Sequence, residues 1–496
     1  MVYHVIQQLV DQAQAVQLID QQDKIYARNQ ILTLLGLTEF KPLVATDAAQ
    51  EDIPVLLEQL IEYAAAHRII EDIFDEKEIL ASKIMNCLVA RPSTVNQIFY
   101  KKYQNSQKAA TDYFYELSKQ SNYIQMKRIQ KNIEYKVSTD YGELDITINL
   151  SKPEKDPRSI EREREAPSTD YPKCLLCVEN EGYGGRIGHP ARANHRMIRV
   201  NLLGENWMLQ YSPYVYYPEH CIVLSEKHMD MNISPQTFQR LLFFVAQFPH
   251  YFLGSNADLP IVGGSILSHE HYQGGHYEFA MAKAETECHF TLFKNPNVDC
   301  SVVRWPMSVI RLRSLQFSPL VDAATHIKNH WQGYSDETRE IIAKTGETRH
   351  NTITPIARKK GEFFELDLVL RNNRTSAEHP LGIFHPHADV HHIKKENIGL
   401  IEVMGLAVLP ARLKDELKEV EKYLLGDQSA SVDEYHATWA EEMRGHYQSI
   451  ISEENVETIV REEVGKKFLK CLEDAAVFKR NEHGREGFHR FIRSIM

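Results

Sequence analysis

Side chains that can act on phosphate are concentrated in the segment from Gly263 to His276. His269, His271 and Gln273 stand at alternate positions, and a glycine pair flanks them on each side. In an extended strand these three side chains would share one face. Glycine lets a phosphate approach the backbone closely, and neutral imidazole is a good nucleophile toward phosphorus. The segment suits phosphoryl chemistry, with a zinc site or an incidental histidine-rich strand as alternatives.

A Cys-x-x-Cys pair, Cys174 and Cys177, precedes this segment. Such a pair is either a redox motif or half of a zinc site. A redox pair usually opens a helix after a strand, whereas here the polar, glycine-rich residues 179–185 predict a loop. We therefore interpret the pair as half of a zinc site that needs two further ligands.

The elements between these motifs predict where the other two ligands lie. Alternating patterns predict strands at 197–203, 207–211 and 220–224, and Ser234 with Pro235 predicts a helix start, with the helix running to about Phe248. A further strand is expected at 277–282. This order indicates an α+β arrangement.

A short sheet covered by that helix would place His228 and His269 at neighbouring strand ends. Cys174, Cys177, His228 and His269 would then form a closed set of two thiolates and two imidazoles, which tetrahedral zinc accepts. His271 is left beside the metal rather than on it. Structural zinc would hold the strand rigid.

The regions around this centre differ in pattern. Helical spacing predicts a helical N-terminal region over 1–130, and alternation then predicts a hairpin over residues 133–150. Lys152 and Lys155 follow in a charged run that reaches residue 165. They could contact a phosphate or simply form a solvated loop.

The second half partly repeats the first. Strands are expected at 352–357 and 364–370, then a second His-x-His and a helical segment at 396–406. We interpret four regions: the helical 1–130, a catalytic unit at 131–320, a degenerate second copy at 321–410, and helices over 411–496. The candidates for a second metal site are His385 and His387, with Glu402 or Glu287, and purely structural histidines are the alternative.

The composition limits the possible partners. The chain has 496 residues, of which 43% are hydrophobic and 25% charged, which is ordinary for a globular enzyme. A net charge of −11 argues against non-specific binding to nucleic acid or anionic membrane. The opening residues show no secretory pattern, and seven scattered cysteines do not indicate a disulfide framework. We expect a cytoplasmic protein.

Together the motifs resemble the galactose-1-phosphate uridylyltransferase family, in its longer second-type branch within the histidine-triad superfamily. The resemblance covers roughly residues 130–410. It implies an α+β fold of two histidine-triad-like units, usually in a homodimer, with zinc held by the four ligands named above. The chain departs from the better-known branch at Glu270, where that branch has proline between the histidines.

The resemblance also implies roles for individual residues. His271 matches the nucleophile that becomes uridylylated, and Gln273 matches the glutamine that binds the transferring phosphoryl oxygens. Gly264, Ser265 and Asn256 match the phosphate-contacting turn and the asparagine before it. Lys152 and Lys155 stand where the family has arginines.

The implied reaction is a ping-pong exchange of UMP between UDP-glucose and galactose 1-phosphate, giving glucose 1-phosphate and UDP-galactose. The other ring nitrogen of His271 should donate to a backbone carbonyl, which would fix its tautomer. Two other functions compete: a histidine-triad nucleotide hydrolase or phosphorylase, and a non-catalytic zinc-binding nucleotide sensor. The first would usually have a third histidine where Gln273 stands, and the second would leave His271 without a role.

Overall fold

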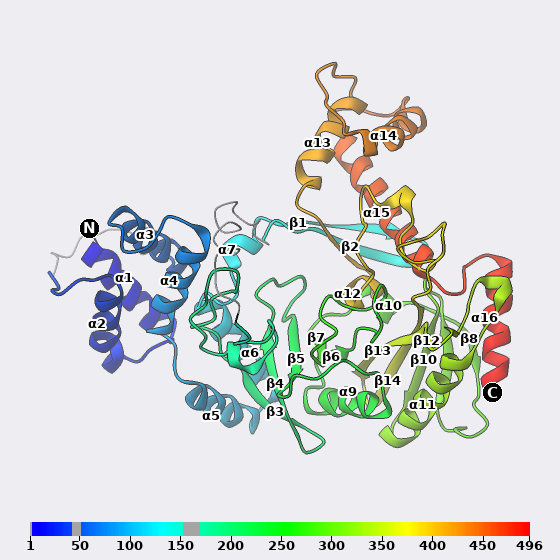
Figure 1. Ribbon diagram of the computed structural model, residues 1–496, viewed down its shortest axis with the longest axis horizontal. Coiled ribbons are helices and arrows are strands. Elements are labelled where there is room, and N and C mark those ends of the chain that lie inside the picture. The colour runs from blue at the N-terminus through cyan, green and yellow to red at the C-terminus, as the bar shows by residue number, and fades with distance from the viewer. Residues whose placement is uncertain (1, 42–50, 152–168) are drawn as a thin grey trace. The chain divides into compact units, whose positions relative to one another are not determined.

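A computed structural model describes residues 2–41, 51–151 and 169–496 of the chain. It divides into two compact units (Figure 1). Unit 1 comprises Met1–Lys131, Ser151–Val215 and Glu219–Met229, and unit 2 comprises Asn132–Leu150, Tyr216–Pro218 and Asp230–Met496. Both units contain helices and sheet strands, so the predicted α+β class is confirmed.

Unit 1 begins with helices, as the sequence predicts. The apolar face predicted from the helical repeat is buried; in α3, Leu56, Leu57 and Leu60 are all in the core. The helices are α1 (Val2–Ala15), η1 (Gln21–Asp23), α2 (Lys24–Leu34), α3 (Ile53–Ala66), α4 (Phe74–Asn86), α5 (Pro92–Tyr103), α6 (Gln107–Gln120) and α7 (Met126–Ile129).

Three antiparallel strands of unit 1 lie close to their predicted positions: β3 (Ile198–Leu202), β4 (Glu205–Tyr211) and β5 (Cys221–Ser225). Side chains tie them to the helices. Arg196 donates from Nε to the carbonyl of Ala90 at 2.7 Å and from Nη2 to Asn86 Oδ1 at 2.8 Å. The hydroxyl of Tyr211 donates to the carbonyl of Thr111 at 3.1 Å. The N-terminal helices therefore form part of the same compact unit as these strands.

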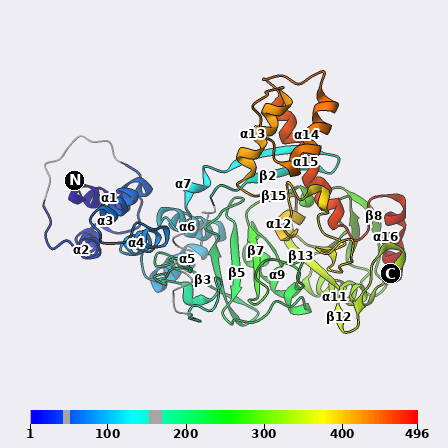
Figure 2. The same ribbon diagram turned by 45° about the horizontal axis from the view of Figure 1, so that its top comes forward.

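The larger sheet of unit 2 has the strand order β7-β6-β13-β14-β10-β9-β8, with each neighbouring pair antiparallel. Figure 2 labels β7, β13 and β8 of this sheet. Helices α9 and α11 pack against β13 and against each other. The predicted start of α9 is confirmed, with Ser234 at the N-cap and Pro235 in the first turn. The elements are α9 (Pro235–Gln247), β6 (Phe252–Gly254), β7 (His271–Gly275), β8 (Thr286–Phe290), β9 (Asp299–Val303), β10 (Val309–Ser314), α11 (Phe317–Gly333), β13 (Asn351–Lys360) and β14 (Phe363–Asn372).

A second sheet of unit 2 has the order β1-β2-β15. The predicted hairpin is confirmed as β1 (Ile133–Thr139) and β2 (Gly142–Ile148). The helix predicted at 396–406 is wrong in extent. Only α12 (Leu400–Val403) is helical, and β15 (Leu406–Leu409) pairs parallel with β2 because its apolar run completes this sheet.

The strand predicted at 277–282 is also wrong. Residues Ala280–Lys283 form the short helix α10, and Met281 donates its backbone N–H to the carbonyl of Met404 at 3.2 Å. Alanine and methionine are strong helix formers, and here the buried Ala-Met-Ala run favours a helical turn over a strand.

The C-terminal region is helical, as predicted. The stripe of Leu413, Leu417, Val420 and Leu424 is buried in α13. The helices are α13 (Leu413–Leu424), α14 (Glu434–Tyr447), α15 (Val456–Ala475) and α16 (Glu482–Ile495); shorter elements of this unit are η3 (Glu337–Arg339), β11 (Lys344–Thr345), β12 (Thr348–Arg349) and η4 (Ala388–Val390). Within the part of the chain that the structure describes, every helix is too short or too polar to span a bilayer.

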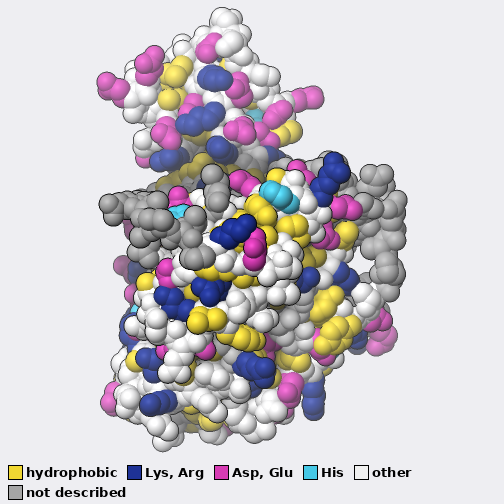
Figure 3. Space-filling view, turned by 90° about the vertical axis from the view of Figure 1, so that its left-hand side faces the viewer, with side chains coloured by type: hydrophobic (Ala, Val, Ile, Leu, Met, Phe, Trp, Pro, Cys, Tyr) yellow, Lys and Arg dark blue, Asp and Glu magenta, His cyan; other side chains and the backbone are white. Residues whose placement is uncertain are grey.

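Basic and acidic side chains are interspersed over the face shown in Figure 3. The described residues of this face therefore do not form a broad field of one sign.

A buried ion network stabilises the centre of the larger sheet. Asp367 on β14 is fully buried and accepts from Arg311 on β10 at 2.7 and 3.0 Å and from Arg358 on β13 at 2.6 Å. Burial alone would raise the pKa of Asp367, but the two guanidinium groups outweigh it and lower the pKa to about 2. Because β13 also pairs with β6 and β6 with β7, this network supports the strand that contains His271.

We expect Asp367→Asn to lower the free energy of unfolding by about 3–5 kcal/mol, because Arg311 loses its buried carboxylate and Arg358 keeps only Glu365, at 3.3 Å. Since the pKa is lowered on folding, the stabilisation by Asp367 is present above its ordinary pKa and is lost as the pH falls toward 2. Urea unfolding of both proteins at pH 7 measures the difference.

The control is Glu457→Gln, which removes an exposed partner of Arg461 and should cost under about 1 kcal/mol. Equal effects of the two substitutions would contradict a stabilising role for the network.

Candidate active site and metal centre

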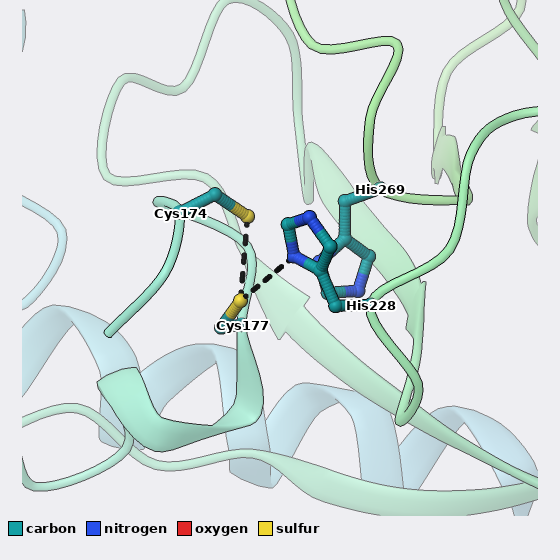
Figure 4. A group of neighbouring side chains, drawn as sticks. All are labelled: Cys174, Cys177, His228 and His269. Carbon is teal, nitrogen blue, oxygen red and sulfur yellow. Dashed lines mark hydrogen bonds between the residues drawn. The ribbon is translucent and has the colours of Figure 1, made fainter. Parts of the chain in front are cut away.

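Cys174, Cys177, His228 and His269 form one group, as the sequence predicts. One ligand atom from each lies within 4.8 Å of all the others, and Figure 4 shows the side chains turned toward one another. The two sulfurs are 3.5 Å apart, and Cys177 Sγ lies 3.2 Å from His228 Nδ1. This arrangement of two thiols and two imidazoles can bind a metal ion.

The loop that presents the thiols is held by Asn180. Its amide donates to the carbonyls of Cys174 and Cys177, both at 2.8 Å, at the end of the short helix η2 (Val178–Asn180). Asn180 Oδ1 in turn lies 2.8 Å from His189 Nε2, which donates to it. The loop is therefore ordered by its own hydrogen bonds.

Cys177 would need a bound cation to be ionised at neutral pH. Burial, with a further contribution from Cys174, raises the pKa of the Cys177 thiol to about 11. A thiol so placed stays protonated at neutral pH unless a nearby cation stabilises the thiolate, and a divalent metal supplies that charge. The residues therefore fit a metal such as zinc in chemistry as well as in spacing.

His271 lies outside this group, at the first position of β7. Its Nδ1 donates to the backbone carbonyl of His269 at 2.8 Å, the hydrogen bond expected from the sequence. The ring is buried, with 5% exposed, and this burial lowers its pKa to about 4. His271 is thus a neutral imidazole at pH 7 with Nε2 available, since no hydrogen bond to Nε2 is found among the described residues.

A buried polar cluster holds the residues on either side of His271. Glu270 accepts from Arg240 of α9 at 3.0 Å and from the hydroxyl of Tyr272 at 2.9 Å. Arg240 also donates to Tyr272 Oη at 3.4 Å, and all three side chains are buried. The cluster fixes the start of β7 to α9, with the two histidines on either side of Glu270.

The predicted phosphate-contacting turn is built around Asn256. Its Oδ1 accepts the backbone N–H of Leu400 at 2.9 Å, which directs the amide NH₂ away from Leu400. A Cβ on Gly264 would come within 2.9 Å of Asn256 Nδ2, so only glycine fits there without displacement. Ser265 follows and is exposed. The structure therefore brings Asn256 and Gly264 together.

Asp258 ties down the same loop. Its carboxylate accepts from Thr352 Oγ1 at 2.5 Å, from Arg349 Nη2 at 2.9 Å and from the backbone N–H of Ile233 at 3.1 Å. These partners come from two segments, residues 349–352 and the residues before α9, so the loop between β6 and β7 is fixed to the sheet and to the start of α9.

Of the other predicted substrate contacts, the structure describes Gln273 but neither of the two lysines. Gln273 lies on β7 opposite Gly254 of β6 and is half-buried. Lys152 and Lys155 lie outside the described residues.

The predicted second metal site is wrong for the residues that the structure describes. His385 donates from Nδ1 to the carbonyl of Pro386 at 3.1 Å, and His387 donates from Nε2 to that of Ile383 at 3.0 Å. The two candidate carboxylates are engaged elsewhere: Glu402 pairs with Lys394 at 3.1 Å and Glu287 with Arg480 at 2.8 Å. These histidines have structural hydrogen bonds instead, the alternative that the sequence left open.

Comparison with known proteins identifies the family to which the chain belongs. Residues 17–230 match the model for the N-terminal domain of galactose-1-phosphate uridyl transferase, and residues 244–441 match that for its C-terminal domain. The chain belongs to the galactose-1-phosphate uridylyltransferase family. The resemblance seen in the sequence is confirmed.

Members of this family match almost the whole chain. The galactose-1-phosphate uridylyltransferase of Clostridium perfringens (strain 13) is 52% identical over 479 residues, covering 96% of each chain. That of Bacillus subtilis (strain 168) is 50% identical over 496 residues, covering 98% of this chain and 96% of its own. The crystal structure of yeast Ap4A phosphorylase Apa2 covers 68% of this chain and 92% of its own at 13% identity, with a TM-score of 0.36, a similarity too low to bear on function.

Sequence reasoning missed three of the residues that position the site. The sequence did not predict that Arg240, Glu270 and Tyr272 contact one another, although Glu270 was noted as a departure from the family pattern. Glu270 and Tyr272 flank His271, and a charged residue in the middle of the apolar α9 segment 235–247 was the available signal for a buried partner.

We expect Glu270→Met to lower the free energy of unfolding by about 3–5 kcal/mol, because Arg240 would stay buried without its carboxylate. The double variant Arg240→Met/Glu270→Met should regain most of this loss, since apolar groups can replace a buried ion pair at little cost. Chemical unfolding of the two single variants and the double variant gives the coupling. Additive losses in the double variant would show that the pair does not act as a unit.

Proposed function

We propose that this chain transfers UMP from UDP-glucose to galactose 1-phosphate through a uridylyl group on His271. Its membership of a nucleotidyltransferase family supports the overall reaction. The observation that carries the residue assignment is the hydrogen bond from His271 Nδ1 to the carbonyl of His269, with His271 outside the metal group. This bond leaves Nε2 as the nucleophilic nitrogen.

In the first half-reaction, the lone pair of His271 Nε2 attacks the α-phosphorus of UDP-glucose. The bond from this phosphorus to the bridging oxygen breaks, and glucose 1-phosphate leaves with the electron pair. The imidazole then holds the uridylyl group and gains positive charge. The carbonyl of His269 stabilises that charge through the hydrogen bond to Nδ1.

In the second half-reaction, a phosphate oxygen of galactose 1-phosphate attacks the same phosphorus from the position that glucose 1-phosphate vacated. The P–N bond breaks and its electrons return to Nε2, giving UDP-galactose. No general base is needed, because the attacking oxygen is already ionised at neutral pH. Restoring the neutral imidazole completes the cycle without a net change in protonation.

The residues around His271 would bind the transferring group. Gln273 is proposed to donate to its equatorial oxygens, where charge develops during transfer. The Asn256 amide NH₂ is held on the side of Gly264 because its oxygen is bound to Leu400. We propose that it and the backbone at Gly264 and Ser265 contact a phosphate, with Lys152 and Lys155 as further predicted contacts.

We propose zinc as the ion for Cys174, Cys177, His228 and His269, because two thiolates and two imidazoles make a closed set of the kind that structural zinc sites use. When bound, zinc would keep both thiols ionised and fix the backbone at His269. That carbonyl is the acceptor for His271, so the metal would act on the nucleophile through its orientation. Homodimer formation and a cytoplasmic location remain predictions.

A histidine-triad hydrolase or phosphorylase and a zinc-binding nucleotide sensor are the competing functions. The three differ in what they do with UDP-glucose. A transferase turns over only when galactose 1-phosphate is also present, a hydrolase or phosphorylase releases nucleotide with water or inorganic phosphate, and a sensor binds without turnover. Incubation of the protein with UDP-glucose, alone and with each acceptor, separates these outcomes.

We expect His271→Asn to reduce exchange by about 10³-fold or more, because the nucleophile is removed. Radiolabelled UDP-glucose carrying the label in its uridylyl group should mark the unsubstituted protein and leave the variant unmarked. Peptide mapping of the label locates the modified side chain.

The matched control is His289→Asn, an exposed histidine on β8 that pairs with Asp299. It should exchange and take up label normally. Label on any residue other than His271 would overturn the assignment.

Metal analysis tests the zinc proposal. We expect about one zinc per chain in the purified protein and a loss of most of it in Cys177→Ser, because three ligands hold structural zinc poorly. The chelator-treated protein should unfold at a lower temperature. Cys288→Ser, which changes a half-buried cysteine outside the group, should keep its metal. Full zinc content in Cys177→Ser would refute this site.

A further inference from the structure

A cavity of about 580 Å³ lies within unit 1, bounded by α3, α4 and the segment from Arg186 to Asn194. Ligand sites commonly enclose about 300–1,000 Å³, so this unit 1 cavity has room for a nucleotide or a sugar phosphate. None of the described residues that line it belongs to the metal group or to the segment from Gly263 to His276.

The acidic side chains that line the unit 1 cavity are already engaged. Glu58 pairs with Lys127, and Glu78 pairs with Arg128 at 2.7 Å. A third carboxylate, that of Asp75, accepts the backbone N–H of Gly188 at 2.9 Å. Glu58 and Glu78 are therefore neutralised by their own cations, and only the charge of Asp75 remains to offset the other cations of the lining.

Three cationic side chains of the lining have no carboxylate partner among the described residues: Lys131, Arg186 and Arg192. Arg192 lies over the ring of Tyr123, 5.2 Å from its centroid. Burial and the positive charges of Arg186 and Arg192 lower the pKa of His189 to about 4. The cavity wall thus has a surplus of positive charge.

Among the residues that the structure describes, two hydrogen-bond donors of the lining are buried without a partner. They are Nη1 of Arg186 and the hydroxyl of Tyr123, whose ring stacks on His195 at a centroid distance of 4.2 Å. Arg186 uses its other terminal nitrogen on the carbonyl of Thr169 at 3.2 Å. A buried donor without an acceptor costs about 1–3 kcal/mol, so each side chain would be stabilised by turning toward acceptors on a ligand in the cavity.

We propose that the unit 1 cavity binds a phosphorylated small molecule, with Arg186, Arg192 and Lys131 receiving the phosphate and Tyr123 lying beside its ring. Guanidinium groups bind phosphate oxygens through paired, charge-assisted hydrogen bonds, and the phenol adds a donor. A neutral ligand would leave these three cations facing only one unneutralised carboxylate, that of Asp75. The site does not depend on the uridylyl transfer proposed above.

The test measures how far a ligand protects Arg186 and Arg192 from chemical modification in the full-length His271→Asn protein. Inorganic phosphate, UMP and glucose 1-phosphate are each added before an arginine-specific dicarbonyl reagent, and mass spectrometry locates the modified arginines. We expect at least one of these ligands to slow modification of Arg186 and Arg192, while exposed Arg91 on unit 1 reacts at an unchanged rate. Protection by phosphate alone would define the site as a simple anion site, and stronger protection by UMP or glucose 1-phosphate would define the attached group.

Calorimetric titration of two variants gives an independent measure. Arg192→Met should weaken binding by about tenfold or more, the value of one charge-assisted hydrogen bond. Tyr123→Phe removes only the hydroxyl and should weaken binding less, and Arg91→Met should leave it unchanged. Equal reactivity of Arg186 and Arg192 with and without all three ligands would overturn the proposal, even if the unsubstituted protein exchanges UMP normally.

Discussion

The chemistry proposed here depends on one hydrogen bond, from Nδ1 of His271 to the backbone carbonyl of His269. A carbonyl can only accept, so this bond requires the proton on Nδ1 and leaves the lone pair on Nε2. It also links the metal group to the proposed nucleophile, because the side chain of His269 belongs to that group while its backbone carbonyl orients the ring of His271. Displacing His269 would therefore disturb His271 without touching its ring.

The rest of unit 2 limits such displacement. Glu270 fixes the residue between the two histidines to Arg240 of α9, and β7 pairs with β6, which pairs with β13. Farther into the sheet, Asp367 holds β14 to its neighbours on both sides. Burying these charges is expensive unless each is paired. Their arrangement suggests a site in which position is maintained by a rigid sheet.

Much of this could be predicted from the sequence, because its signals are local. Three of these signals each span only a few residues. They are the His-x-His-x-Gln core beside glycine pairs, the Cys-x-x-Cys followed by loop residues, and Ser234-Pro235 at a helix start. The grouping of Cys174, Cys177, His228 and His269 was predicted correctly, because the two cysteines share one short loop and the two histidines lie just outside strands β5 and β7.

The errors arose where distant partners decide the structure. Leu406 begins a strand because β2 is there to pair with it, and Ala280–Lys283 is helical although the expected period was that of a strand. His385 and His387 repeat the spacing of His269 and His271, yet their hydrogen bonds are to nearby carbonyls. The spacing of residues along the chain does not reveal which carboxylates are in ion pairs. In the structure Glu402 pairs with Lys394, and Glu287 pairs with Arg480.

The most direct test of this mechanism is to identify the histidine nitrogen to which the uridylyl group becomes bonded. Protein labelled with ¹⁵N-histidine and mixed with UDP-glucose can be studied by NMR, in which coupling between ³¹P and ¹⁵N identifies the bonded nitrogen. We expect coupling to Nε2 of His271, with Nδ1 still protonated toward the carbonyl of His269. Coupling to Nδ1, or to any other histidine, would contradict the central role given to that hydrogen bond.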